Sequence, residues 1–491
     1  MTESTPAPVR KVLLRSSRPC ARPAWHLLVP LLTLVAIIDG CSAGHDYVRP
    51  SAEVTQTYKE AGDWKVAQPQ DGVSRGKWWE AYSDPELNAL EEQAMTSNQG
   101  LAAAEANLRE ARSMVRAAKA DFYPTAAVGL SAGRVQGSSH LGSSKQSTHA
   151  PAISNYSSPI DISWEPDLWG RVRRTVEASE AGAQASEADL ESARLSLGAE
   201  LATDYFSLRA IDADKALLDE TVAAYERSLE ITHNRYAGGV AARSEVVLAT
   251  AQLESTRAQR LDLGVQRARF EHAIAVLIGK PPAALSLPVA PLAATPLVAS
   301  AALPSQLLER RPDIAAAERR VTAANAEIGV AEAAYFPTVS LNASAGLESS
   351  HLSNWFSWPS RFWALGPSIS QTVYDGGRRK AQTEQARALY DGAVAAYRQS
   401  VLAGFQEVED NLAALRILEQ EAEVQQNAVK LARETVTLTM NQYKAGTVNF
   451  LSVVVVQAAA LGAQRSAVDI HSRRMAASVL LTKALGGAWQ E

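Results

Sequence analysis

Apolar residues recur every seven positions over a long stretch, from Arg171 to about Asn234, that contains no proline. Two registers run through it: Leu190, Leu197, Asp204, Ile211, Leu218 and Tyr225, and Leu201, Leu208, Lys215, Val222, Leu229 and Tyr236. Such a sustained repeat predicts a supercoiled helix that packs on neighbouring helices. At a rise of about 1.5 Å per residue the helix would be about 95 Å long. This is roughly three times the hydrocarbon thickness of a bilayer, so we expect the helix to cross an aqueous space.

The same pattern returns later in the chain. Gly170, Tyr236 and Gly239 each have a counterpart 207 residues further on, and these counterparts are Gly377, Tyr443 and Gly446. The second register also recurs, as Val408, Leu415, Ala422, Val429, Val436 and Tyr443. A fixed offset over such a length predicts an internal two-fold repeat. Residues 281–304 separate the two copies and hold six prolines and no charge, so we expect an irregular linker.

A β-hairpin precedes each long helix. In the second half, Val339, Leu341, Ala343, Ala345 and Leu347 alternate with Thr338, Ser340, Asn342 and Ser344, and the partner strand runs from about Phe362 to Val373. The first half has a looser strand from Ala126 to Val135, a polar loop from Gln136 to Ser158, and a second strand through Ile160, Ile162 and Trp164. This alternation fits a strand between lipid and water, and it equally fits a soluble hairpin with one buried face. The neighbouring Trp355, Phe356, Trp358, Phe362 and Trp363 are typical of a membrane interface.

Four strands are too few to form a membrane barrel, because the smallest such barrels use about eight strands and lipid does not tolerate open sheet edges. If the strands lie in a membrane, several chains must share one barrel. The predicted fold is mainly α with a small β part. Each repeat consists of a first helix, a β-hairpin, a long helix and a return helix, and the first of these helices runs from Asp84-Pro85-Glu86 to about Asp121.

The N-terminus has the features of a targeting segment. Five basic residues precede a short apolar run from Trp25 to Ile38, as in a secretory signal. The run is followed by Asp39-Gly40-Cys41, which resembles a lipoprotein signal in which cleavage exposes a cysteine that takes lipid such as palmitate. An ordinary signal with a chance cysteine is the alternative. The predicted segments are a signal peptide at 1–40, a lipid-anchored segment at 41–83, repeats at 84–280 and 305–487 on either side of the linker, and a tail at 488–491.

The composition argues against several classes of function. The net charge is −5, and without residues 1–40, which hold five basic and two acidic residues, it becomes −8, which argues against a nucleic-acid partner. Cys20 and Cys41 are the two cysteines, so the body of the chain has no disulfide framework and no cysteine zinc site. The eight histidines show no helical metal spacing, and we expect no metal and no cofactor.

One motif points to an enzyme. Gly129-Leu130-Ser131-Ala132-Gly133 matches the nucleophile elbow of hydrolases, which places its serine on a turn from strand to helix. Here the motif lies in a strand of small residues that leads into a polar loop. We therefore expect no catalysis, and a secreted esterase that uses Ser131 is retained as a remote alternative.

Several motifs together resemble those of the outer-membrane efflux channel family, in the lipoprotein branch that serves resistance-nodulation-division transporters. They are Cys41 with Asp46-Tyr47-Val48-Arg49-Pro50, Trp78-Trp79 with Asp84-Pro85-Glu86-Leu87, Leu307 to Ile314, Ala334-Tyr335-Phe336-Pro337, Phe405 to Asp410, and Lys483 to Gly487. The resemblance implies a homotrimer with four transmembrane strands per chain in a shared twelve-stranded barrel. It also implies a periplasmic α-barrel, a periplasmic adaptor protein and an inner-membrane pump. The chain would be a passive exit duct in the outer membrane, in contact with its lipid.

The resemblance places the adaptor at the turns that follow the long helices. The candidate docking residues there are Arg235, Tyr236, Gly238, Gly239, Ser244, Tyr443, Lys444, Gly446 and Leu451. The candidate gate residues are Tyr236, Arg243, Met440 and Tyr443, with Arg235, Arg243 and Lys444 available for ion pairs. Alternatively, the tyrosines continue the helix seam and the basic residues are solvated. An adaptor-type coiled-coil lipoprotein is the other rival, although it would carry one hairpin rather than two.

Overall fold

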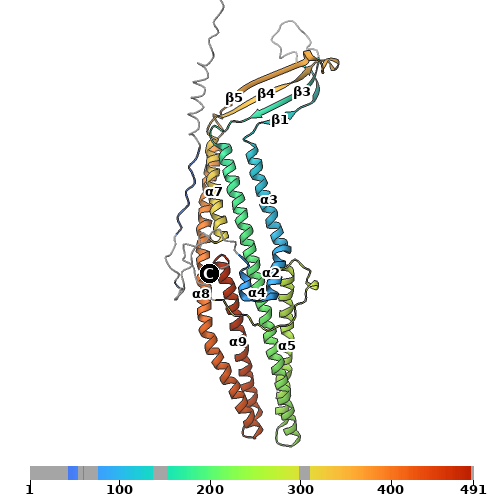
Figure 1. The fold of residues 1–491 in the computed structure, drawn as a ribbon, viewed down its shortest axis with the longest axis vertical. Coiled ribbons are helices and arrows are strands. Elements are labelled where there is room, and N and C mark those ends of the chain that lie inside the picture. The colour runs from blue at the N-terminus through green and yellow to red at the C-terminus, as the bar shows by residue number, and fades with distance from the viewer. Residues whose placement is uncertain (1–42, 53–58, 60–75, 137–151, 298–309, 488–491) are drawn as a thin grey trace, which may run out of the picture.

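The computed structural model describes residues 43–52, 59, 76–136, 152–297 and 310–487. The chain forms an elongated helical bundle with a β-sheet at one end (Figure 1). At the other end, a tight turn joins each long helix to the helix that returns along it. Two helices of 67 residues, α4 (Arg171–Ala237) and α8 (Arg378–Lys444), run along the bundle and are each about 100 Å long. The predicted long helix and its later counterpart are thus both confirmed.

Shorter helices flank each long helix. On the side of the sheet lie α3 (Gln99–Ala120) against α4 and α7 (Pro312–Ala333) against both long helices. On the side of the turns, α5 (Arg243–Leu277) and α9 (Phe450–Ala484) return along α4 and α8. The two return helices have 35 residues each, and α8 and α9 begin 207 residues after α4 and α5.

Each long helix begins after a glycine with positive φ, Gly170 or Gly377, and an aspartate satisfies its first amides. Asp167 accepts hydrogen bonds from the amides of Val172 and Arg173, both at 2.9 Å. At the second helix, Asp375 accepts from the amides of Gly377 at 3.0 Å and Arg379 at 3.2 Å. The N-terminal amides of a helix have no partner within the helix, so these carboxylates fix both starting points beside the sheet.

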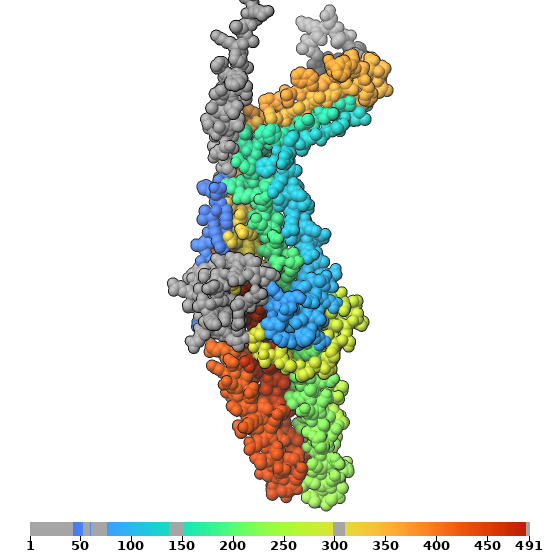
Figure 2. All heavy atoms as spheres, viewed as in Figure 1, coloured from blue at the N-terminus to red at the C-terminus, as the bar shows by residue number. Residues whose placement is uncertain are grey.

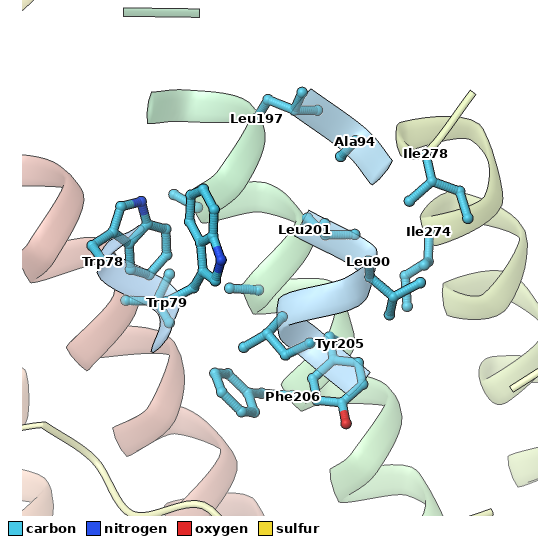
Figure 3. Packing of buried hydrophobic residues seen from close by; sticks show 14 of the residues in the cluster. Trp78, Trp79, Leu90, Ala94, Leu197, Leu201, Tyr205, Phe206, Ile274 and Ile278 are labelled. Atoms are coloured by element: carbon cyan, nitrogen blue, oxygen red, sulfur yellow. The ribbon is translucent and has the colours of Figure 1, made fainter. Parts of the chain in front are cut away.

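The largest hydrophobic core lies at mid-height. A 3-10 helix, η1 (Trp78–Tyr82), and α2 (Pro85–Ser97) pack there against α4, α5 and α9. Trp78 and Trp79 lie on one side of α2, and Ile274 and Ile278 lie on the other (Figure 3). Beyond this core, the irregular segment up to residue 297 contains one short 3-10 helix, η2 (Pro282–Ala284), as expected for the proline-rich linker.

The structure corrects the predicted first helix. The stretch from Asp84 to Asp121 is two helices, α2 and α3, with Asn98 in extended conformation between them. The Asn98 side chain accepts a hydrogen bond from the amide of Leu101 at 3.0 Å and donates one to the carbonyl of Leu277 at 2.8 Å. Asparagine is a favoured N-cap, so Asn98 starts α3. Its bond to Leu277 holds the break between α2 and α3 against the end of α5.

The sheet follows a four-strand path, as predicted, with altered boundaries. β1 (Thr125–Val128) and β2 (Ser131–Val135) both pair with β3 (Ile153–Trp164), which pairs with β4 (Thr338–Ser349), which pairs with β5 (Arg361–Ser370). The first predicted strand is therefore split at Gly129. Residues 153–158, which the sequence placed in a loop, belong to β3, because small polar side chains are tolerated on an exposed sheet. β5 ends at Ser370 rather than at Val373.

One described helix, α9, is long and apolar enough to cross a membrane by length and composition. Its position explains part of this apolarity, because 28 % of the apolar window is buried inside the described chain. It packs along α8 and also contacts α4 and α5. Val453, Ile470, Met475 and Val479 are buried there. These buried residues of α9 serve contacts between helices within the bundle.

Candidate functional site: the sheet and the helical turns

The sheet has one apolar face and one polar face. Antiparallel pairing places Ile160 opposite Ala345 and Ile162 opposite Ala343, and the same face continues onto β5. Trp363, Leu365 and Ile369 on this face of β5 are 77, 75 and 72 % exposed. A row of large apolar side chains this exposed is typical of a surface that meets lipid or another protein.

The opposite face carries hydrogen-bonded polar side chains. Ser344 donates to Asp161 at 2.6 Å, and Ser163 donates to Asn342 at 3.0 Å. Further along, the hydroxyls of Ser340 and Ser368 lie 2.7 Å apart. These bonds cross from strand to strand, so the polar side chains satisfy one another and leave a hydrophilic wall.

The edges of the sheet are unpaired among the described residues. β1 and β2 form one edge and β5 the other, and the sheet does not close on itself. Open edges expose backbone donors and acceptors, which is costly in lipid. A sheet with one apolar face, one polar face and two free edges is suited to closure by further copies of the same sheet.

Aromatic residues gather at both ends of the sheet. At the end beside the helices, Trp169 stacks on Phe336 with ring centroids 4.9 Å apart and donates to the carbonyl of Pro337 at 2.7 Å. At the far end, Trp355 lies against Tyr156 at 5.6 Å and Phe356 at 4.9 Å. Amphipathic rings at both ends of a strand sheet are typical of two membrane interfaces.

At the other end of the bundle, the turns between the helices bring the two halves of the chain together. The guanidinium of Arg235, near the end of α4, lies 4.6 Å from the ring centroid of Tyr443. It also donates to the carbonyl oxygens of Tyr443 at 2.9 Å and Lys444 at 3.3 Å. Arg235 therefore caps the last turn of α8, where the helix dipole favours a cation.

Tyr443 is buried beneath this arginine. Its hydroxyl lies 3.3 Å from the Thr232 hydroxyl and 3.2 Å from the Glu245 carboxylate, within hydrogen-bonding distance of both, and its ring meets Phe450 with centroids 5.4 Å apart. Burial raises the pKa of the Tyr443 hydroxyl above its usual value. Residues of α4, α5, α8 and α9 thus meet at one side chain.

The other predicted residues at the turns are placed differently. Tyr236, the counterpart of Tyr443, is 44 % exposed, and Met440 packs beside Tyr443 in a small apolar cluster. Arg243, Ser244, Lys444 and Leu451 are exposed, and the described residues form no ion pair with Arg243 or with the Lys444 side chain. Gly239 and Gly446 adopt positive φ of 70° and 75°, as the predicted tight turns require, whereas Gly238 keeps a negative φ of −80°.

The described N-terminal strap, residues 43–52, lies along the upper helices. The amide of Ala43 donates to the carbonyl of Trp169 at 3.0 Å, at the base of the sheet. Arg174 donates to Asp46 at 2.9 Å and to the carbonyl of Ala43 at 3.3 Å. Cys41, the predicted lipidation site, lies outside the described residues, as does the predicted signal peptide. The strap nevertheless starts next to the aromatic residues at the helix end of the sheet.

The alternative catalytic residue lies in the sheet. Ser131 is the first residue of β2 and is paired with Ser157 of β3. This is the strand position that the sequence predicted, rather than the turn from strand to helix of a nucleophile elbow. Among the described residues, no group of three or more His, Cys, Asp and Glu side chains is arranged to hold a metal ion.

Sequence reasoning missed two features. The pairing of Arg235 with Tyr443 links residues 208 positions apart, and a periodic pattern does not reveal such a contact. The other is Glu91, a carboxylate with no exposed surface in the core of α2 and α4. It occupies an apolar position of a short helix, where its spacing from Leu87 and Leu90 was a usable signal.

A long helical bundle, carrying at one end an open sheet with a lipid-compatible face, defines a membrane channel protein with a long water-exposed part. The model of the outer membrane efflux protein family matches residues 90–280 and 303–487. The chain belongs to this family, and its place is the outer membrane.

Similar proteins span nearly the whole chain. Outer membrane protein OprJ of Pseudomonas aeruginosa is 31 % identical over 474 residues, which cover 96 % of this chain and 97 % of OprJ. The probable efflux pump outer membrane protein TtgC of Pseudomonas putida is 31 % identical over 467 residues, or 94 % of this chain and 96 % of TtgC. The solved structure of the outer-membrane channel OprN has a TM-score of 0.84 at 30 % identity and covers 92 % of this chain and all of its own.

Proposed function

We propose that this protein is the outer-membrane channel of a tripartite efflux system, a passive duct with no catalysis of its own and no cofactor. The observation that carries the proposal is the sheet with opposite-polarity faces and free edges, mounted on helices of about 100 Å. Its relatives are named as efflux pump and channel proteins of the outer membrane. Small molecules would leave through the duct, driven by an inner-membrane pump of the resistance-nodulation-division class.

The functional unit is a homotrimer whose twelve strands close one barrel. Support comes from the free edges of the sheet and from an apolar seam on α8. Every seventh residue of this seam is a large apolar side chain more than half exposed: Ile417, Val424, Leu431 and Leu438. A heptad seam left uncovered by its own chain fits a helix of a neighbouring copy. Closing the ring would turn the polar faces of the sheets toward the lumen.

The chain is built as two repeats, 84–280 and 305–487, joined by the linker 281–304. The matching lengths of α4 with α8 and of α5 with α9 support this division. The first 40 residues are a signal peptide, and residues 41–83 are a segment anchored through lipid on Cys41. The strap supports the anchor, because Ala43 is already bonded at the base of the sheet, where a membrane surface would lie.

The turns at the far end dock a periplasmic adaptor and form the closed gate. The exposed turn residues Tyr236, Gly239, Ser244, Lys444 and Leu451 are available to a partner. The gate is held by Arg235 and Tyr443, which tie the first helical hairpin to the second within one chain. Opening would separate the two hairpins and break these contacts.

The proposal is tested with the purified full-length protein in detergent and in planar bilayers. We expect a trimer by native mass spectrometry and a stepwise ion conductance after insertion. Cells that carry the matching pump and adaptor should retain more ethidium when the gene is deleted, and the intact gene should restore export. A mature protein that stays monomeric and soluble without detergent would overturn the proposal.

A further inference from the structure

The charged residues of the described strands are divided by face. Four occur: Arg134 in β2, Asp161 in β3, Glu348 in β4 and Arg361 in β5. The alternation of the strands puts both carboxylates on the polar face, where Asp161 bonds to Ser344 and Glu348 accepts from Asn155 at 2.9 Å. It puts both arginines on the apolar face.

The two arginines also lie toward the same end of the sheet, the end away from the helices. Arg361 is the first residue of β5, and Arg134 is the last but one of β2. An arginine in the middle of a lipid-facing strand is costly, but near the interface this cost falls to almost nothing. Both cations therefore occupy the part of the apolar face where a charged headgroup is within reach of an extended side chain.

Arg361 is held in place by an aromatic ring. Its guanidinium lies 4.2 Å from the ring centroid of Trp358, in the short 3-10 helix η4 (Trp358–Ser360) that precedes β5. Among the described residues, no carboxylate forms an ion pair with it. Stacking orients the planar guanidinium and leaves its N–H groups for another acceptor.

The surroundings of this pair are apolar and exposed. Trp358 is 76 % exposed, Trp363 follows on the same face of β5 at 77 %, and Leu365 is next at 75 %. A free anion in water would gain nothing from these side chains. A ligand that places an anionic group on Arg361 and hydrocarbon along β5 would contact both features.

We propose that Arg361 and Trp358 bind the phosphate of a phosphorylated lipid headgroup in the outer leaflet, with its acyl chains against Trp363 and Leu365. The guanidinium presents a fork of donors that matches two phosphate oxygens, which a lysine ammonium cannot reproduce. This site rests on the proposed insertion of the strands as a barrel. It gives the barrel a lipid preference in addition to its hydrophobic fit.

The test measures lipid binding to the purified full-length protein in detergent by native mass spectrometry. The probes are diphosphoryl lipid A and the same lipid after removal of both phosphates. We expect the phosphorylated form to bind more tightly and Arg361→Gln to weaken it about fivefold, since one cation near an anionic surface contributes about that factor. Arg361→Lys should retain part of the binding. Arg227→Gln removes an exposed arginine of α4, far from the sheet, and should change nothing.

Three results would overturn the site: equal binding of the two lipids, full binding by Arg361→Gln, or displacement of the lipid by inorganic phosphate at comparable concentration. Trp358→Leu separates stacking from charge, because it keeps Arg361 but removes the ring, and it should weaken phosphate recognition as well. Conductance in planar bilayers distinguishes this inference from the proposed function. A variant that conducts normally and has lost its lipid preference is the expected outcome, whereas a protein that never conducts speaks against the duct itself.

Discussion

Arg235 and Tyr443 are joined in two ways at the far end of the bundle, through a stacked contact of 4.6 Å and a hydrogen bond of 2.9 Å to the Tyr443 carbonyl. Arg235 belongs to the first helical hairpin and Tyr443 to the second. The contact therefore ties the two hairpins together close to the turns. Beneath it, the Tyr443 hydroxyl reaches Thr232 and Glu245, which extends the tie to α5.

Removing the arginine should loosen the closed end. We expect Arg235→Ala to raise the ratio of open to closed channels about tenfold. A stacked cation and a charged hydrogen bond together contribute roughly 1 to 2 kcal/mol, and 1.4 kcal/mol is a factor of ten. Single-channel recording in planar bilayers measures this ratio. Arg243→Ala is the matched control, since Arg243 is exposed and makes no ion pair among the described residues. An unchanged ratio in Arg235→Ala, or equal changes in both variants, would contradict the proposed tie.

The turn glycines should matter through the backbone rather than through contacts. A Cβ added at Gly239 would meet nothing within 4 Å, yet its φ is 70°. A β-branched residue in the left-handed backbone region costs roughly 1 to 2 kcal/mol, whereas asparagine tolerates this conformation. Gly239→Val should therefore reduce crosslinking to the periplasmic adaptor in cells, and Gly239→Asn should preserve it. Equal crosslinking yields for the two variants would show that the turn geometry is irrelevant to docking.

The lipid anchor and the strands should act as separate membrane signals. Cys41→Ser is expected to abolish labelling with radioactive palmitate, because the thiol is the proposed acceptor. The variant should still fractionate with the outer membrane as a detergent-resistant trimer, since the strands carry their own apolar face. Persistent labelling would place the lipid elsewhere, and loss of the trimer would show that the anchor is needed for insertion.

Local signals predicted the elements well. The heptad pattern predicted a helix that ends at about Asn234, three residues before the observed end of α4 at Ala237. The glycines at 239 and 446 correctly indicated turns that require positive φ. The alternation in β4 correctly assigned its two faces. These features depend on residues near one another in the chain, where periodicity and backbone preference act directly.

Long-range contacts were not predictable in the same way. Nothing near Arg235 in the sequence indicates that its partner is Tyr443, and its own repeat counterpart is Gln442. The break at Asn98 was missed because the helical pattern continues through it, and its cause is a bond to Leu277 in α5. In both cases, tertiary packing decides between options that the local sequence leaves open.

Glu91 is the most unusual group of the mid-height core. Its side chain has no exposed surface, and both carboxyl oxygens are without a hydrogen-bond partner among the described residues. It lies against α4, where a Cβ added at Gly198 would come within 3.1 Å of one carboxyl oxygen and 3.4 Å of Trp78. Burial raises the pKa of Glu91 from 4.5 to about 9, because the ionised form is poorly solvated there.

This shift makes stability depend on pH in a defined direction. Between about pH 4.5 and about pH 9 the folded chain keeps the Glu91 proton while the unfolded chain releases it, so the folded state binds more protons. The free energy of unfolding should therefore fall as pH rises through this window, by at most about 1.4 kcal/mol per pH unit. Asp204, whose pKa burial and Glu200 raise to about 6, adds a smaller fall of the same sign at the acidic end.

Glu91→Leu isolates this contribution, because leucine fills the apolar position and cannot titrate. We expect the variant to be the more stable protein, by a margin that grows from about pH 5 to about pH 9 and then stays constant. Thermal unfolding in detergent, followed by tryptophan fluorescence, measures the margin at each pH. Glu110→Gln removes an exposed carboxylate of α3 and should leave the pH profile of the parent protein intact. A margin for Glu91→Leu that does not vary with pH would mean that Glu91 is ionised or solvated in the folded protein.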